Sequence, residues 1–243
     1  MPAYNAERTI QASIDSVLAQ THKDWELIII NDAAKDSTEE IIKAAQASDS
    51  RVTFLTNEKN SGISFSRNRG IKAAQGVYLA FLDSDDLWRS DKLEKQLIFM
   101  QENKAVISYT ATAYMNAEGE PFGYSLPAKR ELSYKDLMHR NLMSCSSVMV
   151  RREDMVPFPH GDLHEDYAVW LVIVRKAGCA YGLNEPLLIY RIAKGSKSFR
   201  RIPSAIMMYN AYRLAGYRGV GWLTLRYAVH SVAKRLRIRG AIR

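Results

Sequence analysis

The first half of the chain alternates short apolar runs with segments whose apolar residues recur at helical spacing. The apolar runs, each of which predicts a strand, are 25–30, 52–55 and 77–82. The run 25–30 indicates a buried parallel strand. The segments with helical spacing are 7–20, 39–47, 64–74 and 91–100. Strands and helices that alternate in this way build a mostly parallel, Rossmann-like sheet flanked by helices. The sequence therefore predicts an α/β fold.

The second half is less regular. Residues 105–114, 146–150 and 187–191 predict further strands. Residues 116–130 are rich in Gly, Pro and charge, which indicates a hairpin or a loop. Residues 166–176 are mostly apolar and predict a buried helix.

Composition excludes several classes of protein. The chain has 243 residues, of which 47% are hydrophobic and 25% charged, so a buried core is expected rather than general disorder. Two cysteines, Cys145 and Cys179, provide neither a disulfide framework nor a four-ligand zinc site. No apolar run has the length of a transmembrane helix, and no secretory signal pattern is visible. We therefore expect a cytoplasmic protein.

Charge is divided unevenly along the chain. No Asp or Glu follows Glu185, whereas 13 of the 34 lysines and arginines do. The remaining 21 basic residues share residues 1–185 with all 26 acidic ones. An acidic body with a basic end predicts that this end meets an anionic surface.

Three carboxylates follow the apolar run 77–82, in the sequence Asp83-Ser84-Asp85-Asp86. Ligands of open α/β sheets bind beyond the carboxyl ends of the strands, and Asp32 lies at another such end. Clustered carboxylates repel one another, so a cation would neutralise them; oxygen ligands suit Mg²⁺ or Mn²⁺, which also bind diphosphates. The alternative is a solvated turn or a helix cap.

Several motifs occur in an order that resembles family 2 glycosyltransferases of the GT-A fold, which build bacterial surface polysaccharides. They are Pro2-Ala3-Tyr4-Asn5, Asn31-Asp32, residues 60–70, residues 81–86, His164-Glu165-Asp166 and Tyr190-Arg191. The resemblance covers about residues 1–200, so we expect a catalytic domain over 1–200 and a basic helical tail over 201–243.

The resemblance implies a role for each matching residue. Pro2, Tyr4, Asn5 and Glu7 would line the base and ribose, Asp32 would accept a hydrogen bond from the uracil imide, and Gly62 belongs to the same nucleotide-binding set. Arg67 would contact base or phosphate, Asp83 the ribose and Asp85 the metal. Arg191 would neutralise the leaving diphosphate. The alternatives are a turn capped by Asn5, a helix cap at Asp32, a solvated Arg67, and an Arg191 that simply begins the basic tail.

The acid pair Glu165-Asp166 opens the apolar helix predicted at 166–176. Direct displacement at an anomeric carbon needs a base that takes the proton of the acceptor hydroxyl. The resemblance assigns the base to Asp166, with Glu165 in support. The alternative is that these acids only favour the helix dipole.

Two departures from the family pattern concern the fold. The family has an apolar strand before the Pro-x-Tyr-Asn motif, so we expect DNA upstream of the Met1 codon to encode one in frame. The usual glycine of the turn after Asp32 is Ala33 here. If that turn needs a positive φ, Ala33 is strained.

The tail carries one apolar helical stripe with cations outside it. The stripe consists of Trp222, Leu225, Val229, Val232 and Leu236. Such a helix fits an anionic membrane surface, although it could instead pack on the catalytic domain. No recognised nucleic-acid-binding motif accompanies the charge, so no nucleic-acid partner is expected.

The function expected from the sequence is an inverting glycosyltransferase that is peripheral on the inner face of the cell membrane. It would use a nucleotide-sugar donor, expected to be a UDP-sugar, with Mg²⁺ or Mn²⁺, and a saccharide acceptor on a lipid carrier. A nucleotidyltransferase is disfavoured because no Gly-rich, Lys-bearing phosphate loop is present. A non-catalytic nucleotide-sugar-binding protein remains the alternative.

Overall fold

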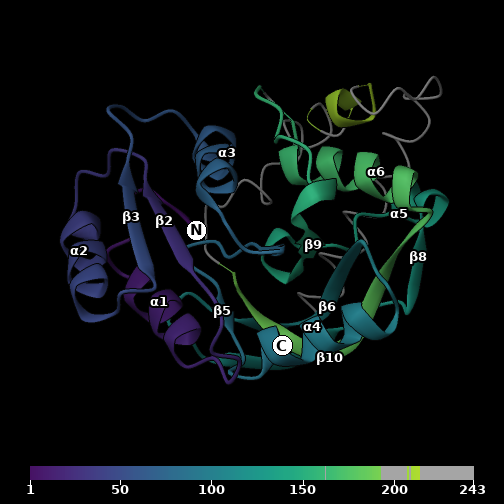
Figure 1. The fold of residues 1–243 in the computed structure, drawn as a ribbon, viewed down its shortest axis with the longest axis horizontal. Coiled ribbons are helices and arrows are strands. Elements are labelled where there is room, and N and C mark those ends of the chain that lie inside the picture. Colours follow the sequence, from purple (N-terminus) through teal and green to yellow (C-terminus); the bar gives the residue numbers. More distant parts are fainter. Residues whose placement is uncertain (162, 193–206, 208, 214–243) are drawn as a thin grey trace.

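The computed structural model describes residues 1–161, 163–192, 207 and 209–213. A small parallel sheet holds three strands in the order β1 (Pro2–Ala3), β2 (Leu27–Asn31) and β3 (Val52–Thr56). Its helices are α1 (Ile10–Leu18), α2 (Thr38–Ser48) and α3 (Ile63–Ala73). Helices α1 and α2 lie on one side of this sheet and α3 on the other (Figure 1). Because helices cover both faces, β2 is buried along its whole length, as its unbroken apolar run predicts.

Helix α3 packs closely on β2. A Cβ atom on Gly70 would lie 2.9 Å from Cδ1 of Ile30, which is closer than two carbon atoms approach. A larger residue at this position would therefore require the Ile30 side chain to shift.

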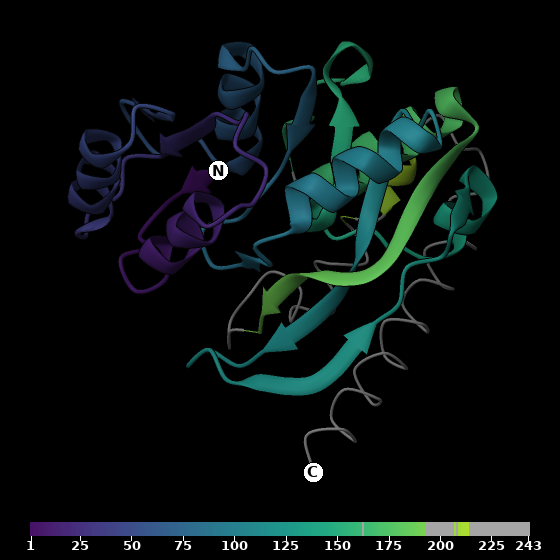
Figure 2. The ribbon, with the colours of Figure 1, turned by 60° about the horizontal axis from the view of Figure 1, so that its bottom comes forward.

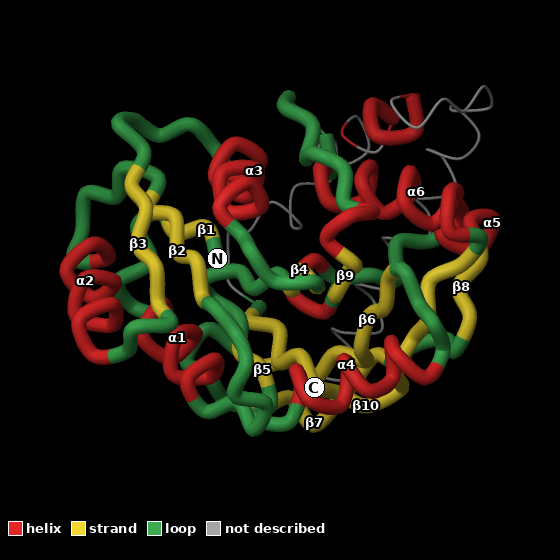
Figure 3. The backbone as a smooth tube through the Cα atoms, viewed as in Figure 1, coloured by secondary structure: helices red, strands yellow, loops and turns green. Residues whose placement is uncertain are grey.

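The larger sheet has seven strands, with β4-β9-β6-β10-β5 in order, β7 beside β6 and β8 beside β10. These strands are β4 (Tyr78–Ala80), β5 (Leu87–Trp88), β6 (Ile107–Met115), β7 (Pro121–Leu126), β8 (Glu131–Ser133), β9 (Met149–Arg151) and β10 (Cys179–Arg191). Helix α4 (Lys92–Glu102) lies on one face, and α5 (Tyr134–His139) and α6 (Glu165–Ala177) lie on the other (Figure 3). Short 3₁₀ turns at Cys145–Ser147 and Arg152–Asp154 flank β9.

The α/β fold is confirmed, although the larger sheet is mixed rather than mostly parallel. Strands β6 and β10 are parallel, whereas the pairs β4–β9, β6–β9, β6–β7, β10–β5 and β10–β8 are antiparallel. The short β6–β7 connection makes these two strands antiparallel. Two neighbouring parallel strands need a crossover connection of about a dozen residues or more. Since β4 and β6 both run opposite to β9, the carboxyl ends of β4, β6 and β10 share one edge.

Two apolar clusters form the core. One lies between α5, α6 and the larger sheet, and the fully buried Trp170 is its largest side chain. The other joins α1, α2 and α4 to β2, with Ile14, Ile29 and Met100 fully buried. No helix in the described part of the chain is long and apolar enough to cross a membrane.

The apolar stripe expected over 222–236 lies outside the described residues. The described part of the tail begins with Met207, and its Tyr212 is buried. The Tyr212 hydroxyl donates a hydrogen bond to the Met138 carbonyl of α5 at 2.8 Å. The division into a domain over 1–200 and a tail over 201–243 stays a prediction.

Candidate active site

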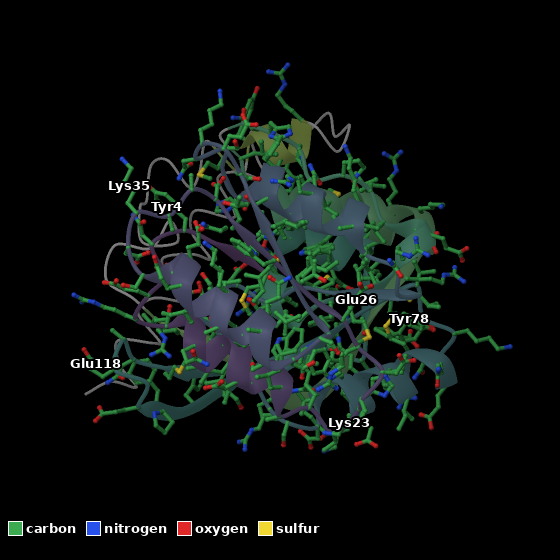
Figure 4. The ribbon with its side chains drawn as sticks, turned by 60° about the vertical axis from the view of Figure 1, so that its left-hand side comes forward. Tyr4, Lys23, Glu26, Lys35, Tyr78 and Glu118 are labelled. Atoms are coloured by element: carbon green, nitrogen blue, oxygen red, sulfur yellow. The ribbon has the colours of Figure 1, made fainter. Side chains whose placement is uncertain are left out.

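The loops that follow β1 and β2 are joined by side-chain hydrogen bonds. Asn5 Oδ1 accepts from the Lys35 amide at 2.9 Å, and Glu7 Oε2 accepts from the Ser37 amide at 3.1 Å. Figure 4 shows the side chains of Tyr4 and Lys35 at the same corner of the molecule, and Tyr4 is 45% exposed. The residues predicted in the Pro2–Ala3 strand and in the loop after it therefore lie together at the carboxyl ends of β1 and β2. Asn5 does not cap α1, whose N-cap is Thr9.

Asp32 is buried at the end of β2, and three hydrogen bonds hold its carboxylate. One carboxylate oxygen accepts from Asn57 Nδ2 at 2.6 Å and from the Ser61 amide at 2.8 Å, and the other accepts from the Gly62 amide at 2.8 Å. Gly62 is the N-cap of α3 and has a φ of 86°. Asp32 therefore anchors the start of α3 and does not cap α2, whose N-cap is Ser37.

The turn after Asp32 has the strain that its sequence predicts. Ala33 has a φ of 57°, a left-handed conformation that glycine adopts without a Cβ penalty. An alanine there costs on the order of 1 kcal/mol.

The acidic loop, defined here as Asp83–Asp86, connects β4 to β5 at the same edge. The Asp83 amide donates to Ser146 Oγ at 3.1 Å, and the Asp86 amide donates to the Asp83 carbonyl at 3.1 Å. Ser13 Oγ donates to the Asp86 carbonyl at 2.8 Å. The loop is thus a turn held from α1 and from the 3₁₀ turn before β9.

Two carboxyl groups of the acidic loop, those of Asp85 and Asp86, resist ionisation. Burial raises the pKa of Asp85 to about 6, with a further contribution from the charge of Asp83. Burial and the neighbouring carboxylates raise the pKa of Asp86 well above its usual value. A bound cation would relieve this repulsion.

The donor set of this loop fits Mg²⁺ or Mn²⁺. No side chain of the described residues donates a hydrogen bond to the Asp85 carboxylate, so its oxygens are available. Throughout the described ranges, no group of three Asp, Glu, His or Cys residues converges as a complete metal site. Mg²⁺ is commonly bound by one or two carboxylates together with substrate phosphates, so Asp85 and the diphosphate of a donor would suffice.

Arg67 joins the acidic loop to α6. Its side chain is buried; Nη2 donates to Asp83 Oδ1 at 2.7 Å and Nη1 to Glu165 Oε1 at 3.1 Å. Burial alone would lower the pKa of the guanidinium, but the carboxylates around it outweigh that effect and raise the pKa. Arg67 thus bridges two acids of the site, and its expected contact with the nucleotide stays a prediction.

Glu165 and Asp166 form the first turn of α6, with His164 as its N-cap. Burial raises the pKa of the half-buried Asp166 to about 7, the charge of Glu165 raises it further, and Arg67 opposes both. Asp166 Oδ1 accepts a hydrogen bond from the Tyr167 amide at 2.7 Å. A carboxyl that titrates near neutral pH can take a proton from a hydroxyl and release it again.

Arg191 lies at the end of β10 and contacts the acidic loop directly. Its Nε donates to the Asp85 carbonyl at 2.9 Å, and its amide donates to Asp86 Oδ1 at 3.0 Å. The structure therefore brings Asp32, Arg67, Asp83, Asp85, Asp166 and Arg191 to one edge of the two sheets.

Sequence reasoning missed two residues of this network, Asn57 and Ser146. Asn57 follows the end of β3, so the rule that placed Asp32 at a strand end could also have found it. Ser146 lies in a 3₁₀ turn within a segment predicted as a strand, and no local signal marks it.

The sequence matches the model of a known protein family. The model of glycosyl transferase family 2 matches residues 1–156, which include the acidic loop and Arg67. The chain belongs to this family. The family 2 glycosyltransferase is 37% identical over 240 residues to TuaG of Bacillus subtilis (strain 168), whose name places it in teichuronic acid biosynthesis; the match covers 97% of this chain and 95% of TuaG. It is also 39% identical over 176 residues to WfgD of Escherichia coli, covering 72% of this chain and 68% of WfgD. WfgD is named as a UDP-Glc:alpha-D-GlcNAc-diphosphoundecaprenol beta-1,3-glucosyltransferase.

Solved structures confirm the GT-A fold of this family 2 glycosyltransferase. Residues 1–349 of S. aureus TarS, solved with UDP, match with a TM-score of 0.71 at 19% identity. That match covers 88% of this chain and 62% of the TarS fragment, so the chain spans less than two thirds of that structure. The mannosyltransferase PcManGT from Pyrobaculum calidifontis, solved with GDP-Man and Mn²⁺, matches with a TM-score of 0.70 at 14% identity over 97% of this chain and 73% of that one.

Proposed function

We propose that the protein is an inverting glycosyltransferase of cell-surface polysaccharide synthesis. It transfers a sugar from a UDP-sugar to a hydroxyl group of a lipid-linked saccharide, and it requires Mg²⁺ or Mn²⁺. Asp166 is the general base.

The observation that carries this proposal is the bridge through Arg67. One guanidinium contacts both Asp83, at the end of β4, and Glu165, the residue before Asp166. The carboxylates suited to a metal diphosphate and the carboxyl suited to a base therefore lie within the reach of a single side chain. A displacement at an anomeric carbon needs this pairing, because leaving group and nucleophile act on the same atom.

The donor site is the strand edge that carries Pro2, Tyr4, Asn5, Glu7, Asp32 and Gly62. Asp32 is held in place by Asn57 and by the start of α3, so it offers a preformed acceptor for a base. A uracil base is proposed because TarS was solved with UDP and WfgD is named for UDP-Glc. Asp83 would contact the ribose, and Asp85 would hold the cation, which supplies positive charge against the leaving diphosphate.

The chemical step follows from the position and pKa of Asp166. Its carboxylate accepts the proton of the acceptor hydroxyl while the hydroxyl oxygen forms a bond to the anomeric carbon. The bond between that carbon and the diphosphate oxygen breaks, and UDP leaves with the electron pair. Attack from the side opposite the leaving group inverts the anomeric centre. A base with a pKa near 7 is suited to this transfer at neutral pH.

The acceptor is proposed from the relatives and from the charge of the tail. WfgD is named for a saccharide on diphosphoundecaprenol, and TuaG for teichuronic acid biosynthesis. The 13 basic residues after Glu185 would hold the enzyme at the anionic inner face of the membrane, where such an acceptor lies.

A nucleotide screen followed by a transfer assay tests the proposal. We expect UDP to raise the melting temperature more with Mn²⁺ than without it, and more than GDP does. A UDP-sugar should then release UDP slowly, and NMR of the transferred sugar should show the opposite anomer. Binding without UDP release would assign the protein to the non-catalytic alternative, and absence of any UDP-dependent shift would overturn the donor.

A further inference from the structure

Arg191 uses its side chain on backbone carbonyls of two different segments. Nε donates to the Asp85 carbonyl at 2.9 Å, and Nη1 donates to the Ala117 carbonyl at 2.8 Å and the Asn116 carbonyl at 3.5 Å. Within the described chain, no carboxylate pairs with this guanidinium. Figure 2 shows the end of β10 beside the β6–β7 hairpin that carries residues 116 and 117.

Both segments are turns with hydrogen bonds of their own. On the hairpin side, the Asn116 amide donates to the Glu120 carbonyl at 2.9 Å, and the Gly119 amide donates to the Asn116 carbonyl at 3.2 Å. On the other side, the Asp86 amide closes the acidic loop on the Asp83 carbonyl. Arg191 therefore connects two preformed turns, and the hairpin turn gives it a fixed anchor at the end of β6.

The planar guanidinium is suited to this task. Nε and Nη1 point in fixed directions, so two carbonyls on different segments are held at a fixed separation. The Arg191 amide adds a bond to Asp86 Oδ1 at 3.0 Å, which holds the end of the same loop. A lysine has a single nitrogen whose donors rotate freely, so it would not hold the two carbonyls at a fixed separation.

We propose that Arg191 is a positioning residue that ties the acidic loop to the β6–β7 turn and thereby orients Asp85. The role rests on the proposed function, because it matters for the reaction only if Asp85 binds the cation. It differs from the expected contact with the leaving diphosphate, since two of the donor atoms of Arg191 are already engaged by the protein. Arg191 holds the loop through the Asp85 carbonyl and leaves the Asp85 carboxylate uncovered.

Hydrogen exchange of the protein without ligand tests the tie by itself. In Arg191→Lys, peptides that cover 83–88 and 115–121 should exchange about tenfold faster, the factor expected when local opening becomes easier by one hydrogen bond to a charged group. Arg89→Lys is the matched control, because Arg89 is exposed and lies three residues after Asp86. It should leave both peptides unchanged, and α2 should be unchanged in both variants. Unchanged loop peptides in Arg191→Lys, or a uniform increase that includes α2, would overturn the proposal.

The metal dependence of UDP binding separates positioning from direct contact with the diphosphate. Arg191→Lys should weaken the apparent affinity for Mn²⁺ in the presence of UDP about tenfold, while metal-free UDP binding changes less than about twofold. An equal loss of metal-free UDP binding would show that Arg191 contacts the nucleotide, and the proposal would then be wrong. If the wild-type protein binds no UDP with Mn²⁺, the proposed donor fails, whereas the exchange experiment still decides the role of Arg191.

Discussion

The guanidinium of Arg67, which is buried, pairs with the Asp83 carboxylate at 2.7 Å, and this ion pair joins α3 to the acidic loop. The same guanidinium reaches Glu165 on α6, so three elements meet on one side chain. Removing a partner of a buried ion pair leaves an uncompensated charge, which costs far more than the net contribution of the pair.

Arg67→Met should therefore reduce the free energy of unfolding by about 3 kcal/mol or more, because it leaves both Asp83 and Glu165 without their cation. Urea unfolding followed by circular dichroism measures this. Lys72→Met is the control: it is exposed on the last turn of the same helix and should change stability by less than about 0.5 kcal/mol. Equal effects of the two substitutions would contradict the bridging role.

Asp85→Ala should abolish the Mn²⁺-dependent stabilisation by UDP while leaving the fold intact. The Asp85 carboxylate accepts no side-chain hydrogen bond in the described chain, so its removal breaks no tie of the acidic loop. Thermal shift with UDP, with and without Mn²⁺, measures the effect, and the exposed Asp24→Ala serves as a control. A variant that binds UDP and Mn²⁺ with unchanged affinity would exclude Asp85 as the ligand.

Asp166→Asn preserves shape but cannot accept a proton, so it should reduce turnover by roughly 10²–10⁴. Donor binding should barely change, because the substitution lies on α6 and not at the donor edge. Glu165→Gln should cost less turnover. Steady-state kinetics and UDP binding of both variants check this, and near-normal transfer in Asp166→Asn with loss in Glu165→Gln would exchange the two roles.

The rate should rise with pH through about 7, because the base must be deprotonated and burial raises the pKa of Asp166 to about 7. The charge of Glu165 also raises this pKa. Glu165→Gln should therefore move the acidic limb of the profile to lower pH. Measuring kcat/KM between about pH 5 and 9 tests this. If the acidic limb of the profile does not move in Glu165→Gln, a group other than Asp166 sets it.

Deleting 222–243 should release the protein from phosphatidylglycerol vesicles and leave UDP binding unchanged. Each Lys or Arg near an anionic surface contributes on the order of 1 kcal/mol, and salt screens this attraction. The apolar stripe from Trp222 to Leu236 adds burial that salt does not screen, so high salt should weaken wild-type binding without eliminating it. Co-sedimentation with phosphatidylglycerol and with phosphatidylcholine vesicles measures both effects. Aggregation of the shortened protein would indicate that the helix packs on the catalytic domain.

The helices and strands of the first half were predictable because each is a local pattern. The segment 64–74 became α3 over Ile63–Ala73, and 39–47 became α2 over Thr38–Ser48. Strand β10 was predicted only from residue 187, but it begins at Cys179. Pro186 lies inside it at a register shift, and proline normally marks an edge or a bulge, so the local sequence conceals the continuity of the strand.

In the candidate site, too, features that follow from a local pattern were predictable, and features that depend on distant residues were not. The carboxylates at strand ends were found because the carboxyl ends of parallel strands share an edge, which requires no knowledge of side chains. The partners of Arg67 and Arg191 could not be predicted. An arginine can bind a ligand, a carboxylate or a carbonyl, and which of these it binds depends on residues that are distant in sequence. The positive φ of Ala33 was predicted neither by a local pattern nor by a contact. It was expected because the family has a glycine at this position, and the structure confirms it.

Because the chain is synthesised from its N-terminus, the contacts of this site become possible in a fixed order. The bond between Arg67 and Glu165 spans 98 residues, and that between Arg191 and Asp85 spans 106, whereas the contacts of Asp32 with Ser61 and Gly62 span 29 and 30. Contacts between residues close in sequence close smaller loops and form earlier. The contacts around Asp32 can therefore form while the ribosome is still adding α6, but the acidic loop is bound by Arg191 only when β10 has emerged. A nascent chain that stalls before Arg191 would hold Asp32 in place and leave the acidic loop without this contact.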